Sequence, residues 1–507
     1  MKPRHFLACS LLLLVGLLEI SAALHGTIPP GTVVLRVLPW AALSLAVAAA
    51  ASVRPAWSRV ALVLSADGFL LYESILGILQ VFGRASSRHV LFRMTGSFDN
   101  PGPYGCFVAV VSVVVLTYLL EERKQAEGGP KRLLLILSAL ALSAGLSVLP
   151  ASLSRTGWVA FALGGAVAIV RAGDRVRNWL RQHRALAISF ITGVVAVCGV
   201  GLWLIKPDSA RGRLHMWRIE CLAVMEHPLS GSGPDAQMSA YGQAQEHFFA
   251  RKMRSAGAIA AAGCPEYAFN EYLGLAMQGG IGAGLLAIAA VVLSLLALRK
   301  TYPEAFAGML AWSICAAASY PLSVSPLNAA LAVFLGLALS GGGRTGKTIL
   351  AAIAVIASVF FAARTREARH IGRVSFRALY EQGYALHESG MWDESDSLLK
   401  EGLKYSSDPM FLNIMGKNAE AQGLADDAEA LYLRSIHRVP CRLYPRLLLS
   451  RLYLRTGRSE SALEASREAL AMPVHPRHKP MQELHERLRA VEDSAKMALN
   501  SPLVLIK

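Results

Sequence analysis

Charged residues are scarce in this chain. Asp, Glu, Lys and Arg make up 17% of its 507 residues, and 54% are apolar; a soluble domain has about a quarter charged. The apolar excess fills residues 5–363 and ends there, and the C-terminal remainder is rich in charge. The scarcity excludes an entirely soluble protein. We predict an all-α fold: a polytopic membrane domain over residues 1–365 and a soluble helical domain over residues 375–500.

Cysteine patterns typical of metal sites or disulfide frameworks are also missing. The seven cysteines show no CxxC spacing, so the sequence predicts no metal site. Cys221 and Cys264 fall in the same polar segment, where they either pair or remain free thiols.

Signals for nucleotide and nucleic-acid binding are weak. Residues 341–348 match the phosphate-loop pattern, but that motif needs a preceding strand, and no strand pattern is readable. We interpret them as a cytoplasmic turn and predict no cofactor. The net charge of +16 lies largely in short loops between apolar runs, which indicates membrane topology rather than nucleic-acid binding.

Long apolar runs dominate what the chain does contain. A membrane-spanning helix needs about 20 apolar residues. About eleven runs approach this length: 6–24, 33–52, 60–82, 104–120, 133–149, 158–170, 185–205, 272–298, 305–320, 326–339 and 349–363. The first run also has the features of a cleavable signal peptide.

Basic residues between these runs predict the orientation. With the N-terminus in the cytoplasm, Arg54, Arg59, Arg171, Arg299 and Lys300 all fall in cytoplasmic loops. The large polar segment 206–271, which we expect to be a loop and call the central segment below, and the C-terminal domain then lie on the periplasmic side. Three arginines in the loop after the third run oppose this rule, namely Arg84, Arg88 and Arg93.

The C-terminal part repeats. Gly390, Gly423 and Gly457 recur at spacings of 33 and 34, and five residues after each comes a small residue: Ser395, Ala428 or Ala462. This period is typical of tetratricopeptide repeats, in which glycine permits the turn between two closely packed helices. We predict about three repeats over residues 375–473, followed by a capping helix, and a protein partner that binds them.

Several polar motifs interrupt the membrane domain in a fixed order. They are residues 95–101, 153–158, 212–217, 227–233 and 268–273, the last of which precedes Gly279, Gly280 and Gly282. In this order and context the chain resembles the O-antigen ligase and polymerase superfamily of bacterial membrane glycosyltransferases, over roughly residues 90–290. Some members of that family also carry C-terminal tetratricopeptide repeats.

The resemblance implies a function. Such enzymes take a glycan from an undecaprenyl-diphosphate carrier at the periplasmic face of the inner membrane and pass it to a hydroxyl of a glycolipid, glycan or protein acceptor. They are metal-independent and have no nucleotide-sugar site. Arg213 matches the family's loop arginine, and Arg155 matches the arginine after the fifth span.

The chemistry of these residue types agrees with that role. Arginine stays protonated and binds phosphate oxygens with a rigid fork, so it suits a leaving diphosphate. We predict Arg155 and Arg213 as ligands of the carrier diphosphate, with Arg211 as a third ligand or an ordinary loop charge. Trp217 falls one helical turn after Arg213 if that segment is helical.

The chain departs from the family at one position. Ligases carry a histidine before the asparagine that matches Asn270, and here that position is Phe269, which cannot move a proton. We predict Glu266 as the catalytic base, with Glu271, His215 and His247 as alternatives. Asn270 either orients the acceptor or caps the next helix.

Three interpretations of function remain open: an O-antigen ligase, a polysaccharide polymerase or protein O-glycosylase of the same fold, and a non-catalytic membrane-anchored repeat scaffold. Acidic residues inside predicted spans need a partner or a polar cavity. Glu73 is therefore expected either to line the carrier path or to pair with Arg36.

Overall fold

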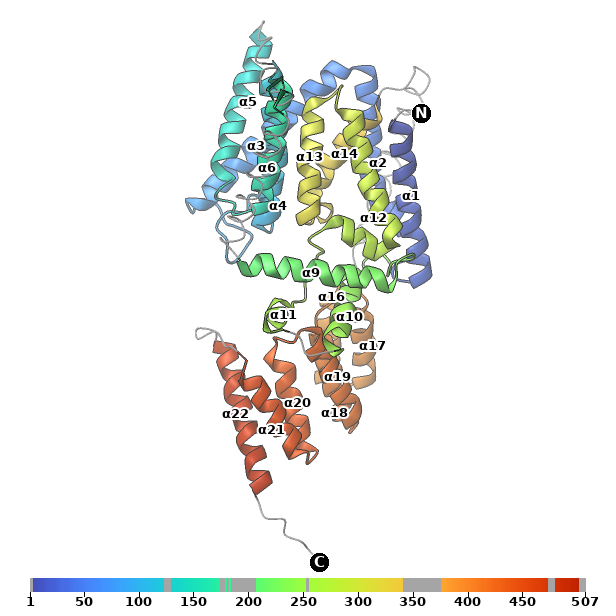
Figure 1. Cartoon of the computed structure of the whole chain (residues 1–507), viewed down its shortest axis with the longest axis vertical. Coiled ribbons are helices and arrows are strands. Elements are labelled where there is room, and N and C mark those ends of the chain that lie inside the picture. The colour runs from blue at the N-terminus through green and yellow to red at the C-terminus, as the bar shows by residue number, and fades with distance from the viewer. Residues whose placement is uncertain are drawn as a thin grey trace, which may run out of the picture. The chain divides into compact units, whose positions relative to one another are not determined.

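The protein consists of helices and their connections. The computed structural model describes residues 3–122, 129–173, 178–179, 182–183, 207–251, 255–340, 375–472 and 479–500, and no strand occurs in these ranges. The chain divides into two compact units (Figure 1). The first comprises Met1–Pro207, Leu229–Gly231 and Ala268–Gly372, and the second comprises Asp208–Pro228, Ser232–Tyr267 and Arg373–Lys507.

The first unit contains nine helices in the described ranges. They are α1 (Pro3–His25), α2 (Thr32–Val53), α3 (Pro55–Val81), α4 (Pro101–Glu122), α5 (Gly129–Val148), α6 (Arg155–Ala172), α12 (Glu271–Leu298), α13 (Pro303–Ala318) and α14 (Ser325–Leu339). Each coincides with one of the predicted apolar runs. Within the described ranges, six helices are long and apolar enough to cross a membrane: α1 to α5 and α12. The predicted spans 185–205 and 349–363, and the turn 341–348, lie outside the described residues.

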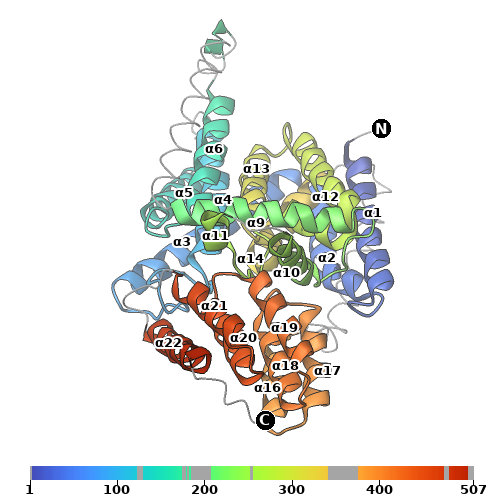
Figure 2. The same ribbon diagram turned by 60° about the horizontal axis from the view of Figure 1, so that its bottom comes forward.

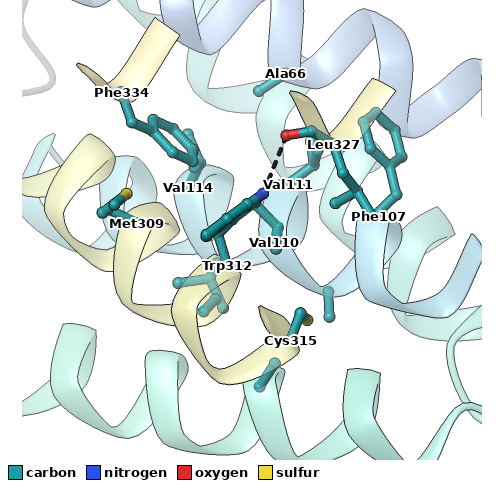
Figure 3. Packing of buried hydrophobic residues seen from close by; sticks show 14 of the residues in the cluster. Ala66, Phe107, Val110, Val111, Val114, Met309, Trp312, Cys315, Leu327 and Phe334 are labelled. Atoms are coloured by element: carbon teal, nitrogen blue, oxygen red, sulfur yellow. Dashed lines mark hydrogen bonds between the residues drawn. The ribbon is translucent and has the colours of Figure 1, made fainter. Parts of the chain in front are cut away.

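Helix α4 is the centre of the first unit. It is apolar on all sides, and 83% of the residues in its apolar stretch are buried inside the protein. Helices α3, α5, α6 and α13 pack around it. Trp312 of α13 lies against Val110, Val111 and Val114 of α4 (Figure 3). The indole Nε1 of Trp312 donates a hydrogen bond to the Leu327 carbonyl at 3.0 Å, so its polar group is satisfied inside the core.

Helix α12 is broken within its apolar length. Gly279 and Gly280 have non-helical backbone angles, and Gly280, at φ 79° and ψ 174°, occupies a region essentially restricted to glycine. A broken helix at membrane depth must satisfy its freed backbone groups within the protein. The Ser21 hydroxyl of α1 does so by donating to the Gln278 carbonyl at 2.6 Å. Helix α1 packs along α12 as part of the core of this unit.

Two acidic side chains in the predicted spans accept hydrogen bonds from backbone amides. The Glu19 carboxylate accepts hydrogen bonds from the Gly31 and Val34 amides at the start of α2. The Glu73 carboxylate accepts from the backbone amide and the hydroxyl of Ser97, at 2.9 and 2.6 Å. The Glu73 carboxylate thus fixes the loop before α4, and the alternatives expected for it, a carrier path or a pair with Arg36, stay predictions.

The second unit joins the central segment to the C-terminal hairpins. The central segment, expected as an extended loop, is largely helical: α9 (Pro207–Glu226), α10 (Gln237–Ala250) and α11 (Ala256–Ala261). The C-terminal helices are α16 (Phe376–Glu388), α17 (Trp392–Leu403), α18 (Met410–Ala421), α19 (Ala425–Arg438), α20 (Leu443–Arg455), α21 (Ser459–Leu470) and α22 (Lys479–Asn500). Figure 2 shows α16 to α21 as three neighbouring hairpins, with α22 against α21.

The three hairpins follow the spacing read from the sequence. Gly390, Gly423 and Gly457 all have φ between 76° and 78°, the left-handed conformation that a tight turn between helices requires. The small residues five positions later are fully buried between paired helices: Ser395, Ala428 and Ala462. The assignment of these hairpins to tetratricopeptide repeats stays a prediction.

A buried ion pair fastens α10 to α19. The Glu246 carboxylate accepts hydrogen bonds from Arg434 Nε at 2.7 Å and Arg438 Nη2 at 3.0 Å, and the Arg438 side chain is only 2% exposed. The Gln245 amide on the same turn donates to the Arg438 carbonyl at 2.5 Å. The central segment is therefore packed onto the hairpins by polar contacts, of which those of Arg438 are buried.

This ion pair generates a stability prediction. Glu246→Gln keeps the shape but leaves the buried Arg438 charge without its counter-ion, which costs about 3–5 kcal/mol. We expect a lower midpoint of thermal unfolding for the full chain in detergent, and faster amide hydrogen exchange in α10 and α19.

The control is Glu401→Gln, which removes the partner of an exposed Lys404 pair at 2.6 Å and should change stability by under about 1 kcal/mol. Equal effects of the two substitutions would show that the Glu246 contact does not hold α10 in place.

Candidate functional site

The predicted site residues are divided between the two units. Arg155 and Asn270 belong to the first unit, and Arg211, Arg213 and Glu266 belong to the second. The expectation that Arg155 and Arg213 share one hollow stays a prediction, so each part of the site is described within its own unit.

Arg155 begins α6 at a corner where three elements meet. Ser154 is the N-cap: its hydroxyl accepts from the Gly157 amide at 3.3 Å and donates to the Gly102 carbonyl at 2.9 Å. The Thr156 hydroxyl donates to the Ala318 carbonyl at the end of α13. The start of α6 is thereby fixed to the start of α4 and the end of α13, and we call this place the Arg155 corner.

Two glycines make the corner tight. A Cβ on Gly157 would lie 2.5 Å from the Gly105 carbonyl oxygen, so α4 and α6 touch through backbone. This contact brings together two of the motifs that the sequence singled out, residues 95–101 and 153–158. A side chain larger than glycine's hydrogen at position 157 would push Arg155 away from the start of α4.

The electrostatics of the corner favour an anion. The first turn of α6 lies at the positive end of the helix dipole. It holds no acidic residue, and Arg155, which is half-buried, adds a positive charge at the same end. A basic side chain at a helix N-terminus destabilises the helix unless an anion lies beside it.

Residues 318–322 connect this corner to the start of α12. Their Ala318 carbonyl accepts from Thr156, and the Tyr320 ring contacts Phe269 edge-on with centroids 5.2 Å apart. The Leu322 amide donates to the Glu271 carboxylate at 2.7 Å. Arg155 and the segment 269–271 therefore lie on one continuous network of the first unit.

Asn270 caps α12. Its side-chain oxygen accepts from the Tyr272 and Leu273 amides at 3.1 and 3.2 Å, the geometry of an N-cap. Of the two roles expected for Asn270, the structure shows the cap, and orientation of an acceptor stays a prediction. Glu271, an alternative base, is engaged with the Leu322 amide.

Arg211 and Arg213 lie on α9. Arg211 is exposed and Arg213 is half-buried. Because the segment is helical, Trp217 lies one turn after Arg213 on the same face, as expected. Residues two apart face different directions on a helix, so Arg211 and Arg213 point to different sides of α9.

The opposite side of α9 packs inward on α10. His215 is buried against Phe248 and Phe249, and its Nε2 is 3.2 Å from the Gln245 side-chain oxygen. Burial lowers the pKa of His215, which keeps its imidazole neutral. As an alternative base it is therefore shielded inside the second unit, whereas His247 is exposed and 3.0 Å from Glu226.

Glu266 lies at the edge of the central segment, beside the first hairpin. Its carboxylate forms an ion pair with Arg377 at the start of α16 and is about half exposed. The neighbouring Pro265 carbonyl accepts from the Ser407 hydroxyl at 3.0 Å. The sequence could not reveal the ion pair of Glu266 with Arg377, because the two residues are 111 positions apart. The role of Glu266 as base stays a prediction.

The cysteines of the central segment do not pair. Cys221 and Cys264 are both free thiols, which decides between the two alternatives. Cys264 Sγ instead accepts a hydrogen bond from Arg442 Nη2 at 2.8 Å.

Glu220 is a polar residue that the sequence reading missed. It is fully buried on α9, and no described residue hydrogen-bonds either carboxylate oxygen. Burial raises its pKa from 4.5 to about 8. The sequence does contain a sign of this burial. Glu220 is next to Ile219 and one helical turn before Ala223 and Val224, so it falls on the apolar side of the helix, and these neighbours are buried.

Glu220 generates a pH-dependent prediction. The folded state holds this proton up to about pH 8 while the unfolded state loses it near pH 4.5, so stability falls as pH rises between these values. Glu220→Gln should therefore stabilise the protein more at pH 8 than at pH 5, by a difference on the order of 4 kcal/mol.

Thermal unfolding of both proteins at the two pH values measures this difference. Glu483→Gln, at an exposed position of α22, should show none. A wild-type and Glu220→Gln pair that respond to pH alike would contradict a buried carboxyl at this position.

Comparison with known families places the site residues in one matched region. Residues 138–288 match the family model described as O-Antigen ligase. The matched part contains Arg155, Arg213, Glu266 and Asn270, and ends before the hairpins begin. A search of curated proteins found no match to the chain. The match supports the resemblance to the O-antigen ligase superfamily, with activity of the ligase or polymerase type, and with the apolar helices it indicates a multi-pass inner-membrane protein.

Proposed function

We propose that the protein transfers a glycan from an undecaprenyl-diphosphate carrier to an acceptor hydroxyl on the periplasmic face, as an O-antigen ligase does. The observation that carries this proposal is the Arg155 corner: an arginine at the N-terminus of α6, with no acid in that turn, inside the region that matches the O-antigen ligase model. Such a corner is suited to the negative charge that grows on a leaving diphosphate.

The chemistry follows from the donor. The acceptor oxygen attacks the anomeric carbon of the glycan, and the bond from that carbon to the diphosphate oxygen breaks. The electron pair of that bond stays on the diphosphate, whose charge Arg155 and Arg213 stabilise in this proposal, with Arg211 as a third ligand. The acceptor proton passes to Glu266 in this scheme. Because guanidinium groups remain charged, they need no proton transfer of their own.

An apolar pocket in the first unit supports a lipid-linked donor. It has a volume of about 80 Å³ beside Glu271 and Tyr272, and is otherwise walled by hydrocarbon side chains such as Leu11, Leu275 and Leu335. A pocket of this lining suits part of a branched hydrocarbon chain. It lies where α12 begins, on the network that leads to the Arg155 corner.

The packing of the second unit supports a common side for the central segment and the hairpins. Segments that pack together through Glu246 and Arg438 cannot be separated by a membrane. Between them the described residues contain α12, α13 and α14. Three crossings would place the hairpins on the opposite side, so a common side requires a further crossing, for which the sequence predicts the span 349–363.

One observation favours a non-catalytic scaffold. The position of the family histidine is Phe269, whose ring packs edge-on against Tyr320 and is part of the structure's packing. A protein that kept the fold and lost the chemistry would show such a replacement. Measured transfer decides between this scaffold and the transferase.

The transferase proposal predicts strong effects at two arginines. Arg155→Ala and Arg213→Ala should each lower transfer from a polyprenyl-diphosphate glycan about a hundredfold or more, because each removes a fixed cation from the leaving group. The assay uses the purified full chain with a defined lipid-linked oligosaccharide, and Arg251→Ala, which removes an exposed charge at the end of α10, is the control. Transfer that persists unchanged in both variants excludes the diphosphate role, and its absence in the wild-type protein favours the scaffold.

A second prediction concerns topology. The test uses a phosphatase that is active only in the periplasm. It is fused to the chain truncated after Gly257, to the chain truncated after Arg299, and to the full chain after Lys507. The fusions at 257 and 507 should be active, and the fusion at 299, between α12 and α13, should be inactive. Opposite activities at 257 and 507 would contradict a shared side for the central segment and the hairpins.

A further inference from the structure

A cavity of about 260 Å³ lies within the second unit, between the central segment and the first hairpin with the turn that follows it. Its walls come from the turn before α10, the end of the central segment, the start of α16 and the turn after α17. The lining residues are Asp235, Gln237, Met238, Glu266, Tyr267, Ser375, Phe376, Arg377 and Tyr405. The volume lies below the range of pockets for drug-sized ligands, so it suits one small ring.

Part of the lining is aromatic and apolar. Tyr267, Phe376 and Tyr405 present rings, and Met238 adds a flexible thioether. Tyr405 is fixed in place because it is 8% exposed and its hydroxyl donates to Glu401 at 3.2 Å. Flat apolar surfaces of this kind pack against the C–H faces of a ring whose polar groups point outward along its edge.

The polar part of the lining combines donors, chiefly the Arg377 guanidinium, with acceptors. Glu266 and Asp235 contribute carboxylates, which accept hydrogen bonds only. The Glu266 carboxylate is held by Arg377, so its orientation is set before any ligand arrives. Asp235 has a φ of 65°, and non-glycine residues in this region cluster at ligand sites.

Gln237 gives an independent sign of a missing partner. Its side chain is only 9% exposed, and among the described residues nothing donates to its Oε1. Buried polar atoms in native proteins nearly always have a partner, and those that lack one need an explanation. This oxygen is closed off from solvent, so the Gln237 side chain has to rotate toward the cavity before a ligand can donate a hydrogen bond to it.

These features together select a class of ligand. A ring with C–H faces and several hydroxyl donors is a sugar, and two carboxylates against one guanidinium disfavour an acidic sugar or a phosphate. We propose that this cavity binds one neutral sugar unit of the acceptor glycan, between the central segment and the hairpins. Its role as acceptor site rests on the proposed transferase function, whereas the sugar binding itself does not.

The proposal gives the hairpins a direct part in substrate recognition. Ser375, Phe376, Arg377 and Tyr405 belong to the C-terminal region and supply about half of the lining. The bound sugar would also lie beside Glu266, the predicted base, so the acceptor hydroxyl and the group that takes its proton would share one wall.

Saturation-transfer difference NMR on the full chain in lipid nanodiscs tests the binding directly. The probes are a neutral hexose disaccharide, an N-acetylhexosamine disaccharide and a uronic acid disaccharide, with no lipid-linked donor present. We expect binding of at least one neutral probe and none of the uronic acid probe. Gln237→Leu and Glu266→Gln should each weaken the neutral probe about fivefold or more, because each removes an acceptor at nearly constant volume.

The matched control is Gln243→Leu, which makes the same replacement at an exposed position of α10 outside the cavity and should bind as the wild-type protein does. Glu266→Gln preserves the shape of the side chain and keeps the test decisive if Gln237→Leu fails to fold. Absence of all neutral binding, preference for the uronic acid probe, or wild-type affinity in folded variants at positions 237 and 266 overturns the proposal.

Transfer assays separate this inference from the proposed function. If the variants at positions 237 and 266 bind the sugar more weakly and Arg213→Ala still lowers transfer from the donor, the acceptor cavity and the transferase are both supported. Loss of transfer in Arg213→Ala, with no sugar bound by the wild-type protein, leaves the transferase and removes the acceptor cavity. Sugar binding by a protein that performs no transfer keeps the cavity and removes the transferase.

Discussion

The contact of Glu246 with Arg434 and Arg438 is the constraint on which the second unit depends. The Glu246 carboxylate and the Arg438 guanidinium are removed from water there, which is stable only if the two groups stay together, whereas Arg434 stays partly exposed. Because the pair joins α10 to α19, the central segment and the C-terminal hairpins form one compact body. The cavity beside Glu266 exists only because both parts contribute walls to it.

The membrane helices and the hairpins were predictable because their signals are local. Apolar runs of sufficient length gave the positions of α1 to α6 and α12 to α14, and the glycines at 390, 423 and 457 gave the three turns. Both signals depend on nearest neighbours in sequence, namely helix length in a bilayer and backbone freedom at a turn.

The remaining features depend on contacts between distant residues, which no local pattern encodes. The binding of Glu73 to Ser97, of Glu266 to Arg377 and of Glu246 to α19 all join separate elements. The central segment was expected to be a loop, since its polar composition hides the helices α9 to α11. At the candidate site, the sequence named Arg155 and Asn270. The network through residues 318–322 that links their surroundings became visible only in the structure.

The break in α12 also constrains how the membrane unit is assembled. The carbonyl of Gln278 finds its donor in Ser21, a residue 257 positions earlier in the chain. Helix α1 therefore enters the membrane long before its partner is synthesised, and α12 cannot complete its backbone hydrogen bonding until the two meet. Assembly of this unit therefore includes a late docking of its first helix onto α12, after α2 to α6 have been synthesised.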